Sequence, residues 1–178
     1  MGLLKLFAKL TRKKPDTSAV IPAKILRVSD YLSEKTIRFF SPDVSQQQIL
    51  ESLVGTLNVA DPKTALKELT AREEKGATVI TPGLAVPHAR LTGLTCIVAA
   101  LGICSAGVSY AANVGLVRLF LLFLSPQEKM REHLIFLAGV SFLFQQEGLV
   151  ETLSQLQTPE AVIAQIRGLE APPPKFLP

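Results

Sequence analysis

The sequence contains no tryptophan and only two residues each of cysteine, histidine, methionine and tyrosine. Cys96 and Cys104 lack the CxxC spacing of a zinc or redox site, so we interpret them as ordinary buried thiols in a reducing compartment. His88 and His133 lack the HExxH spacing of a metalloprotease, and two imidazoles alone make a poor zinc site. These scarcities argue against a metal centre.

Motifs of two common enzyme classes are also missing. No GxGxxG or GxxxxGK[ST] stretch supports nucleotide binding, and no GxSxG stretch supports a serine hydrolase. The net charge of +4 does not indicate nucleic-acid binding either. The basic excess lies at the N-terminus, at Lys5, Lys9, Arg12, Lys13 and Lys14. The near-neutral remainder offers no basic stripe for a phosphate backbone.

The stretch from Leu91 to Val117 contains no charged residue and is long enough to cross a bilayer as a helix. Glycines and other small residues interrupt it, and strands buried on both faces also form continuous apolar runs. We expect a buried sheet here, with a membrane span as the alternative. Residues 1–14 lack the apolar core and cleavage site of a secretory signal, so we expect a cytoplasmic protein.

Residues 1–14 place Leu3, Phe7 and Leu10 on one face of a helix, with the basic residues largely elsewhere. Such a segment either lies peripherally on the inner face of an anionic membrane or on a partner, or is a solvated extension. A linker follows, so we interpret residues 1–24 as an extension outside the domain. Residues 171–178, APPPKFLP, form a proline-rich tail that cannot continue a helix.

Between these ends, residues 25–170 alternate strand and helix signals. Ser125 is expected to cap the helix that carries His133. Because strands and helices interleave, the sequence predicts one α/β domain with helices on both faces of its sheet. Capping signals predict helices at 45–57, 61–76 and 125–145 and two shorter ones after them; apolar runs predict strands at 36–40, 77–81, 84–86, 94–103 and 116–124.

His88 follows Pro87 in the uncharged stretch GLAVPHAR. A lone histidine is more often a structural hydrogen-bonding residue than a catalyst. Pro87, however, removes a backbone donor and a torsional freedom just before the ring, and loops at strand ends hold functional groups on a rigid scaffold. We therefore interpret His88, in the loop after the strand at 84–86, as a nucleophile that carries a phosphoryl group.

Phosphoryl transfer requires positive charge and donors around the transferred group, and Arg72 and His133 are the candidates. Arginine grips phosphate with a planar fork of donors. Each residue also has a structural interpretation. Arg72 is a favourable charge near the C-terminal end of its helix, and His133 is a hydrogen-bonded core histidine on an apolar helix.

The segment ALKELTAREEKGATVITPGLAVPHARLTGL resembles the phosphohistidine region of enzyme IIA of the bacterial phosphoenolpyruvate-dependent phosphotransferase system. The similarity is to its fructose, mannitol and nitrogen-regulatory class. It rests on a helix that ends in ARE, a short strand, and a glycine and alternating apolar residues before Pro87 and His88. It extends from about residue 25 to 170 and includes LVRLFLLFLSP and HLIFLAGVSFLF.

The resemblance implies that His88 accepts a phosphoryl group from the histidine-containing phosphocarrier protein, with Arg72 as the neighbouring arginine and His133 as the second active-site histidine. It implies a mixed sheet between helices, an enzyme IIB or a regulated target as partner, and neither metal nor nucleotide at the site. One departure concerns residues 110–117. Family members carry acidic residues there, in a stretch like FDAxDGxPV, and this chain has none.

Three functions are compatible with this sequence. The first is a phosphocarrier that passes the group to an enzyme IIB on another chain for sugar transport. The second is a regulator in which phosphorylation of His88 changes a binding surface, as in nitrogen regulation; the basic N-terminus and the absence of a fused permease favour it. The third is a membrane-integrated or non-catalytic binding protein with a degenerate site.

Overall fold

A six-stranded sheet lies between two layers of helices in the computed structural model, which describes residues 26–111 and 114–170. The strand order is β1-β5-β6-β3-β2, and β4 pairs with the residues of β6 that follow those paired with β3. Parallel and antiparallel pairs both occur, so the predicted single α/β domain with a mixed sheet is confirmed. The strands are β1 (Ile37–Phe39), β2 (Val79–Thr81), β3 (Leu84–Ala85), β4 (His88–Leu91), β5 (Val98–Ser109) and β6 (Leu116–Pro126).

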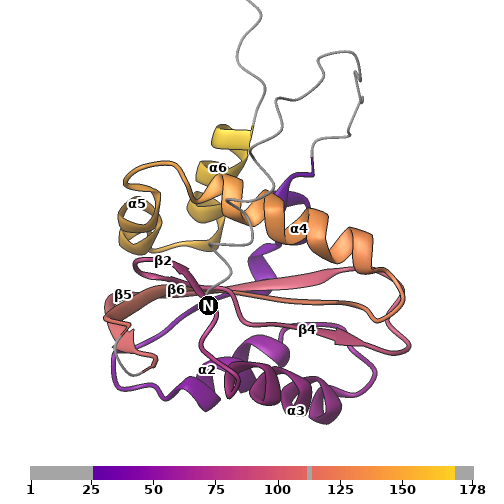
Figure 1. The fold of residues 1–178 in the computed structure, drawn as a ribbon. Helices are drawn as coiled ribbons and strands as arrows, with labels where there is room; N and C mark the ends of the chain where they lie inside the picture. The colour runs from indigo at the N-terminus through magenta and orange to yellow at the C-terminus, as the bar shows by residue number, and fades with distance from the viewer. Residues whose placement is uncertain (1–25, 112–113, 171–178) are drawn as a thin grey trace, which may run out of the picture.

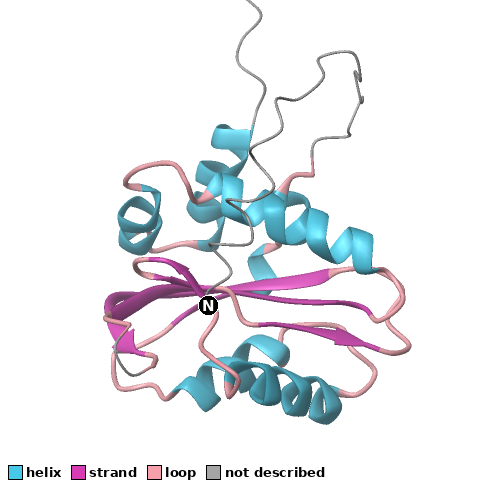
Figure 2. Ribbon diagram, viewed as in Figure 1, coloured by secondary structure: helices cyan, strands magenta, loops and turns pink. Residues whose placement is uncertain are grey.

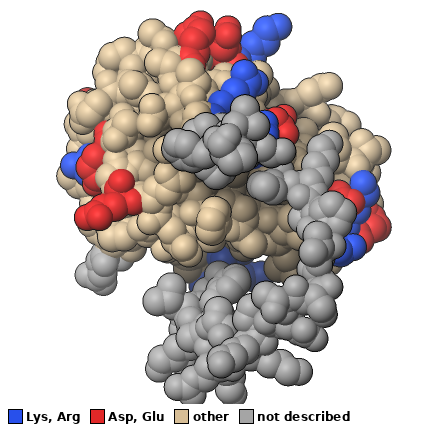
Figure 3. All heavy atoms as spheres, turned by 90° about the horizontal axis from the view of Figure 1, so that it is seen from above, with Lys and Arg blue, Asp and Glu red and all other residues tan. Residues whose placement is uncertain are grey.

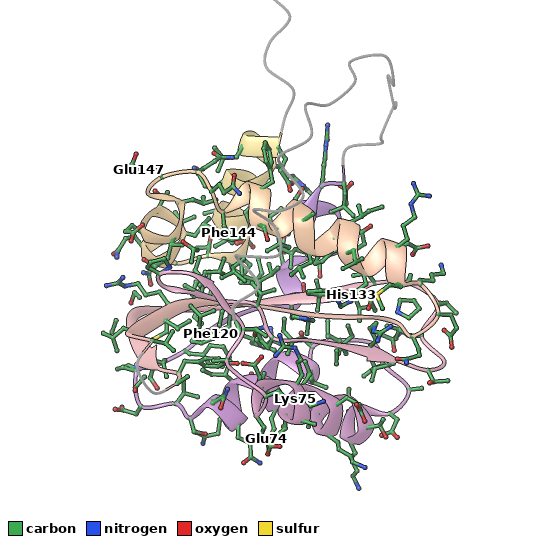
Figure 4. All side chains as sticks on the ribbon, in the orientation of Figure 1. Glu74, Lys75, Phe120, His133, Phe144 and Glu147 are labelled. Atoms are coloured by element: carbon green, nitrogen blue, oxygen red, sulfur yellow. The ribbon has the colours of Figure 1, made fainter. Side chains whose placement is uncertain are left out.

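Helices cover both faces of the sheet (Figures 1 and 2). One face carries α2 (Gln46–Val54) and α3 (Pro62–Glu73), and the other carries α4 (Met130–Leu143), α5 (Leu149–Gln155) and α6 (Pro159–Glu170). The short 3-10 helices η1 (Val28–Tyr31) and η2 (Glu34–Thr36) precede β1. Alternate residues of β6 enter the two cores: Phe123 packs under α4, and Phe120 packs on the α2 and α3 side (Figure 4).

Capping residues define the starts of α2 and α3 as the sequence predicts. The Ser45 hydroxyl accepts from the Gln48 amide at 3.2 Å, and the Gln48 side chain accepts from the Ser45 amide at 2.9 Å. Asp61 accepts from the Thr64 amide at 3.0 Å and precedes Pro62. The second of these helices brings Arg72 into its last turn.

The long uncharged stretch forms buried strands, as expected. Residues of β5 are buried on both faces of the sheet over most of its length, which explains the continuous apolar run. Over residues 26–111 and 114–170 no helix has the length and apolarity to span a bilayer. The strand begins at Val98 and runs to Ser109, later and longer than predicted. The expectation that both cysteines are buried is wrong for Cys96, which lies exposed before this strand, whereas Cys104 is buried.

The predicted start of the helix at Ser125 is wrong. Ser125 and Pro126 are the last residues of β6, and α4 begins at Met130 without a side-chain cap. Pairing with β4 continues to Pro126, and the Gln127 amide donates to the Leu91 carbonyl at 2.9 Å. Hydrogen bonding between β4 and β6 therefore keeps Ser125 and Pro126 in a strand, although the local sequence favours a helix start.

The predicted extension at 1–24 and the predicted tail at 171–178 lie outside the described residues. The domain boundaries at 25 and 170 therefore stay predictions.

Candidate functional site

The parallel pairing of β4 with β6 determines where His88 lies. His88 pairs with Phe123, and Arg90 pairs with Ser125. Paired residues of parallel strands project to the same face, so these four side chains share the face that α4 covers. The predicted placement of His88 in a loop is wrong, because His88 is the first residue of β4. The strand starts there because Pro87 has no amide hydrogen, while its carbonyl accepts from the Phe123 amide at 3.1 Å.

The half-buried His88 ring is held at one nitrogen. Nδ1 lies 2.8 Å from the Val86 carbonyl oxygen, which only accepts, so Nδ1 is the donor. The ring also stacks on Phe123, with 5.2 Å between centroids and 13° between planes. Nε2 of the neutral ring consequently carries the lone pair, and it is the nitrogen available for nucleophilic attack.

His133 projects from the first turn of α4 towards the sheet (Figure 4). Its ring centroid lies 5.3 Å from that of His88 and 5.2 Å from that of Phe123. The side chain is only 7% exposed, and its Nδ1 lies 2.8 Å from the Ser125 hydroxyl. The structure thus brings the two histidines together, and His133 is at the same time a hydrogen-bonded residue of the core.

Arg72 approaches the site from the other layer of helices. It lies in the last turn of α3, where Nη1 donates to the Gly76 carbonyl at 3.0 Å. The helix packs against β4, the strand of His88, and the charge of Arg72 lowers the pKa of His88. This position also suits the structural interpretation of a cation at a helix C-terminus.

Burial keeps both imidazoles neutral near pH 7. Desolvation lowers the pKa of His88, the hydrogen bond to Val86 opposes that shift, and the charges of Arg72 and Glu73 act in opposite directions. The pKa of His133 is lowered to about 4, mainly by desolvation, with smaller contributions from His88 and from the charge of Arg90. The site therefore pairs a neutral nucleophile with a neutral second histidine, under the influence of two guanidinium groups.

Sequence reasoning missed two groups of residues around this site. Arg90 and Ser125 were missed because the pairing of β4 with β6 was not foreseen. The alternation His-Ala-Arg would have indicated Arg90, had residues 88–91 been predicted as a strand, because residues two apart share a face.

The other missed group is the buried carboxylate of Glu73 and its donors. Glu73 accepts from the Thr78 amide at 3.3 Å, from the Thr78 hydroxyl at 2.5 Å and from the Tyr110 hydroxyl at 3.0 Å. The Thr78 carbonyl in turn accepts from the Val86 amide at 2.9 Å, and the Val86 carbonyl holds His88. A continuous set of hydrogen bonds thus connects Tyr110 and Glu73 to the imidazole.

Comparison with solved structures gives the same fold. Nitrogen regulatory protein IIA-Ntr from Neisseria meningitidis has a TM-score of 0.70 at 25% identity, over 78% of this chain and 98% of that one. The Escherichia coli complex of enzyme IIA-Mtl with phosphorylated enzyme IIB-Mtl has a TM-score of 0.63 at 15% identity, over 77% of this chain and 97% of that one.

Sequence comparison identifies the family. A nitrogen regulatory protein of Pseudomonas aeruginosa is 29% identical over 126 residues, which are 68% of this chain and 82% of that protein. The fructose-specific EIIABC component of Bacillus subtilis is 24% identical over 143 residues, which are 78% of this chain and 22% of that longer protein. The family model for the phosphoenolpyruvate-dependent sugar phosphotransferase system, EIIA 2, matches residues 30–168. With most of its length matched and its sheet and helices shared with IIA-Ntr, the chain belongs to this EIIA family.

Proposed function

We propose that the chain is a phosphohistidine carrier in which Nε2 of His88 accepts a phosphoryl group from the histidine-containing phosphocarrier protein. The hydrogen bond from Nδ1 to the Val86 carbonyl supports this proposal most directly, because it leaves Nε2 unprotonated and fixes its direction. Burial supports it too, because a lowered pKa keeps the imidazole in the nucleophilic form at neutral pH.

In the proposed step, the lone pair of Nε2 forms a bond to phosphorus while the bond from phosphorus to the carrier's histidine breaks. The electron pair of that bond goes to the carrier's nitrogen, and the Nδ1 proton of His88 stays at the Val86 carbonyl. Transfer through a loose transition state depends on positioning and on charge around the phosphoryl oxygens. Arg72 supplies the charge, Arg90 adds to it, and His133 supplies a neutral donor.

The surface beside His133 suits a protein donor. Met130 and Leu134 are 45% and 54% exposed, and they flank the buried His133 on α4. Figure 3 looks onto the face that carries α4, α5 and α6, where uncharged atoms predominate. Exposed apolar side chains beside a nucleophile are typical of a docking site for a protein partner. The same surface would receive the downstream acceptor, for which the complex of the E. coli relative with an enzyme IIB is the precedent.

A second use of the phosphoryl group is regulation. The similarity to nitrogen regulatory proteins favours it. Phosphorylation adds about −1.5 to −2 charges to this largely uncharged surface, which is enough to change what binds there. Here the phosphorylated and free forms would bind a target protein differently, and no sugar would be moved.

The experiment combines the full chain with labelled phosphoenolpyruvate, enzyme I and the carrier protein. We expect acid-labile label on the wild type and none on folded His88→Ala. Arg72→Ala should take up label about 10²- to 10³-fold more slowly, as expected for the loss of one preorganised electrostatic contact. Arg167→Ala is the matched control, because Arg167 also lies in the last turn of a helix, α6. Absence of label on wild type with a cognate carrier would refute phosphoryl transfer.

We also propose a peripheral contact of residues 1–14 with the cytoplasmic face of an anionic membrane. The amphipathic pattern of this segment, outside the described residues, supports it. Co-sedimentation of the full chain with phosphatidylserine vesicles should weaken in Phe7→Glu. Equal sedimentation of both proteins would contradict the contact.

A further inference from the structure

The Ser125 hydroxyl is a buried polar group that the proposed mechanism does not yet use. The residue is fully buried at the end of β6, at 0% exposure. Its Oγ lies 2.8 Å from Nδ1 of His133, and among the described residues it has no other hydrogen-bond partner. Within the described part of the chain, His133 is therefore the one hydrogen-bond partner of the Ser125 side chain.

The direction of this hydrogen bond follows from the hydroxyl proton. If Nδ1 of His133 donated to Oγ, the serine proton would be left without an acceptor in a fully buried position, which is unfavourable. If the serine donates, its proton is satisfied and Nδ1 of His133 is the acceptor. A neutral imidazole that accepts at Nδ1 carries its own proton at Nε2.

We propose that Ser125 is a positioning residue for phosphoryl transfer, because its hydroxyl donates to Nδ1 of His133 and fixes that ring with its proton on Nε2. This inference rests on the proposed function of His88. The two histidines then have opposite tautomers. His88 donates through Nδ1 to Val86 and offers a lone pair at Nε2, whereas His133 accepts at Nδ1 and offers an N–H.

Opposite tautomers suit the transfer step. With ring centroids 5.3 Å apart, the two histidines are close enough for a phosphoryl group on His88 to meet a donor on His133. An N–H aimed at a phosphoryl oxygen stabilises its charge, whereas a lone pair in its place would repel it. The lowered pKa of His133 agrees with a neutral ring. Arg90, paired with Ser125 on the neighbouring strand, contributes to that shift.

Nitrogen-15 NMR of the two-bond couplings between ring protons and ring nitrogens tests the tautomer in the wild type itself. At neutral pH we expect an unprotonated Nδ1 and a protonated Nε2 for His133, and the reverse for His88. A His133 protonated at Nδ1, or at both nitrogens, would overturn the proposal. This measurement needs neither a variant nor a partner protein.

The functional test compares the rates at which Ser125→Ala and Ser154→Ala take up label from the phosphorylated carrier protein. Ser154 is the matched control: it is 1% exposed, and its hydroxyl donates to the Glu151 carbonyl in α5, away from the histidines. Ser125→Ala should be about 5- to 30-fold slower, the effect of losing one hydrogen bond. Its His133 should titrate at higher pH than in the wild type, because the donor that favours the neutral form is gone.

Ser125→Thr retains the hydroxyl and should restore both the rate and the titration towards those of the wild type. A rate for Ser125→Ala equal to that of the wild type, or an equal loss in Ser154→Ala, would overturn the positioning role. If the wild type itself takes up no label, the proposed function of His88 fails. The tautomer measurement would still decide the direction of the serine hydrogen bond.

Discussion

The hydrogen bond from Tyr110 to Glu73 should contribute measurably to the stability of the domain. Glu73 is 7% exposed, and one of the three hydrogen bonds that its carboxylate accepts comes from the Tyr110 hydroxyl, at 3.0 Å. Burial and the nearby carboxylate both raise the pKa of Tyr110, so its hydroxyl keeps the proton that it donates. Tyr110→Phe removes this donor and leaves the ring, which packs on Phe120 at a centroid distance of 5.2 Å.

The expected loss follows from the charge of the acceptor. A hydrogen bond to a charged group contributes about 1.5 to 3 kcal/mol, and Tyr110→Phe should lower the free energy of unfolding by that amount. For a domain of this size the melting temperature should then fall by about 3 to 12 °C. Urea denaturation followed by circular dichroism measures the free energy, with the denaturant slope as a check that the transition stays two-state.

Tyr31→Phe is the matched control, because the chain has only two tyrosines. The Tyr31 ring packs edge-on against Phe136, and its hydroxyl forms no hydrogen bond to a described residue. We expect this substitution to change the free energy of unfolding by less than about 0.5 kcal/mol. An effect of Tyr110→Phe as small as that of the control would refute the reasoning, since Glu73 would then not depend on the tyrosine.

Two further predictions concern stability. Because burial lowers the pKa of His133 to about 4, the unfolded chain binds a proton that the folded chain does not. The free energy of unfolding should therefore decrease by about 2 to 3 kcal/mol from about pH 6.5 to 4. His133→Gln should weaken this dependence of stability on pH. The same pH dependence in the variant as in the wild type would show that His133 is not its cause. A Cβ on Gly102 would lie 2.7 Å from the Phe40 ring, so Gly102→Ala should destabilise by about 1 to 3 kcal/mol in urea titration. Gly168→Ala, with no atom within 4 Å, should be neutral or stabilising; equal losses in both variants would reject the steric explanation.

Local sequence signals predicted the individual helices and strands better than they predicted how the strands pair. The capping box of α2 and the Asp61 cap of α3 are short-range patterns, and the structure contains both as expected. Ser125 carried an equally good signal for a helix start, yet pairing with β4 keeps it in a strand. That pairing joins segments far apart in the chain, which no local pattern encodes.

The composition of the site shows the same limit. The sequence identified His88, Arg72 and His133 as candidates from their residue types and neighbours. It did not show that Phe123 packs against both imidazole rings, or that hydrogen bonds through Thr78 connect Glu73 and Tyr110 to Val86. These contacts depend on the register of β4 against β6 and on where β5 ends, directly before Tyr110. Both are determined by tertiary structure and not by local sequence.

The register of β3 and β4 against β6 restricts which changes of length this chain can tolerate. Leu84 pairs with Leu119 and His88 with Phe123, so both strands keep one offset across Pro87. One residue inserted or deleted between them would turn the imidazole towards the α3 layer, because side chains alternate along a strand. Alignment gaps between positions 84 and 88 would therefore distinguish relatives that have lost the histidine's placement from those that keep it, even where a histidine is still present.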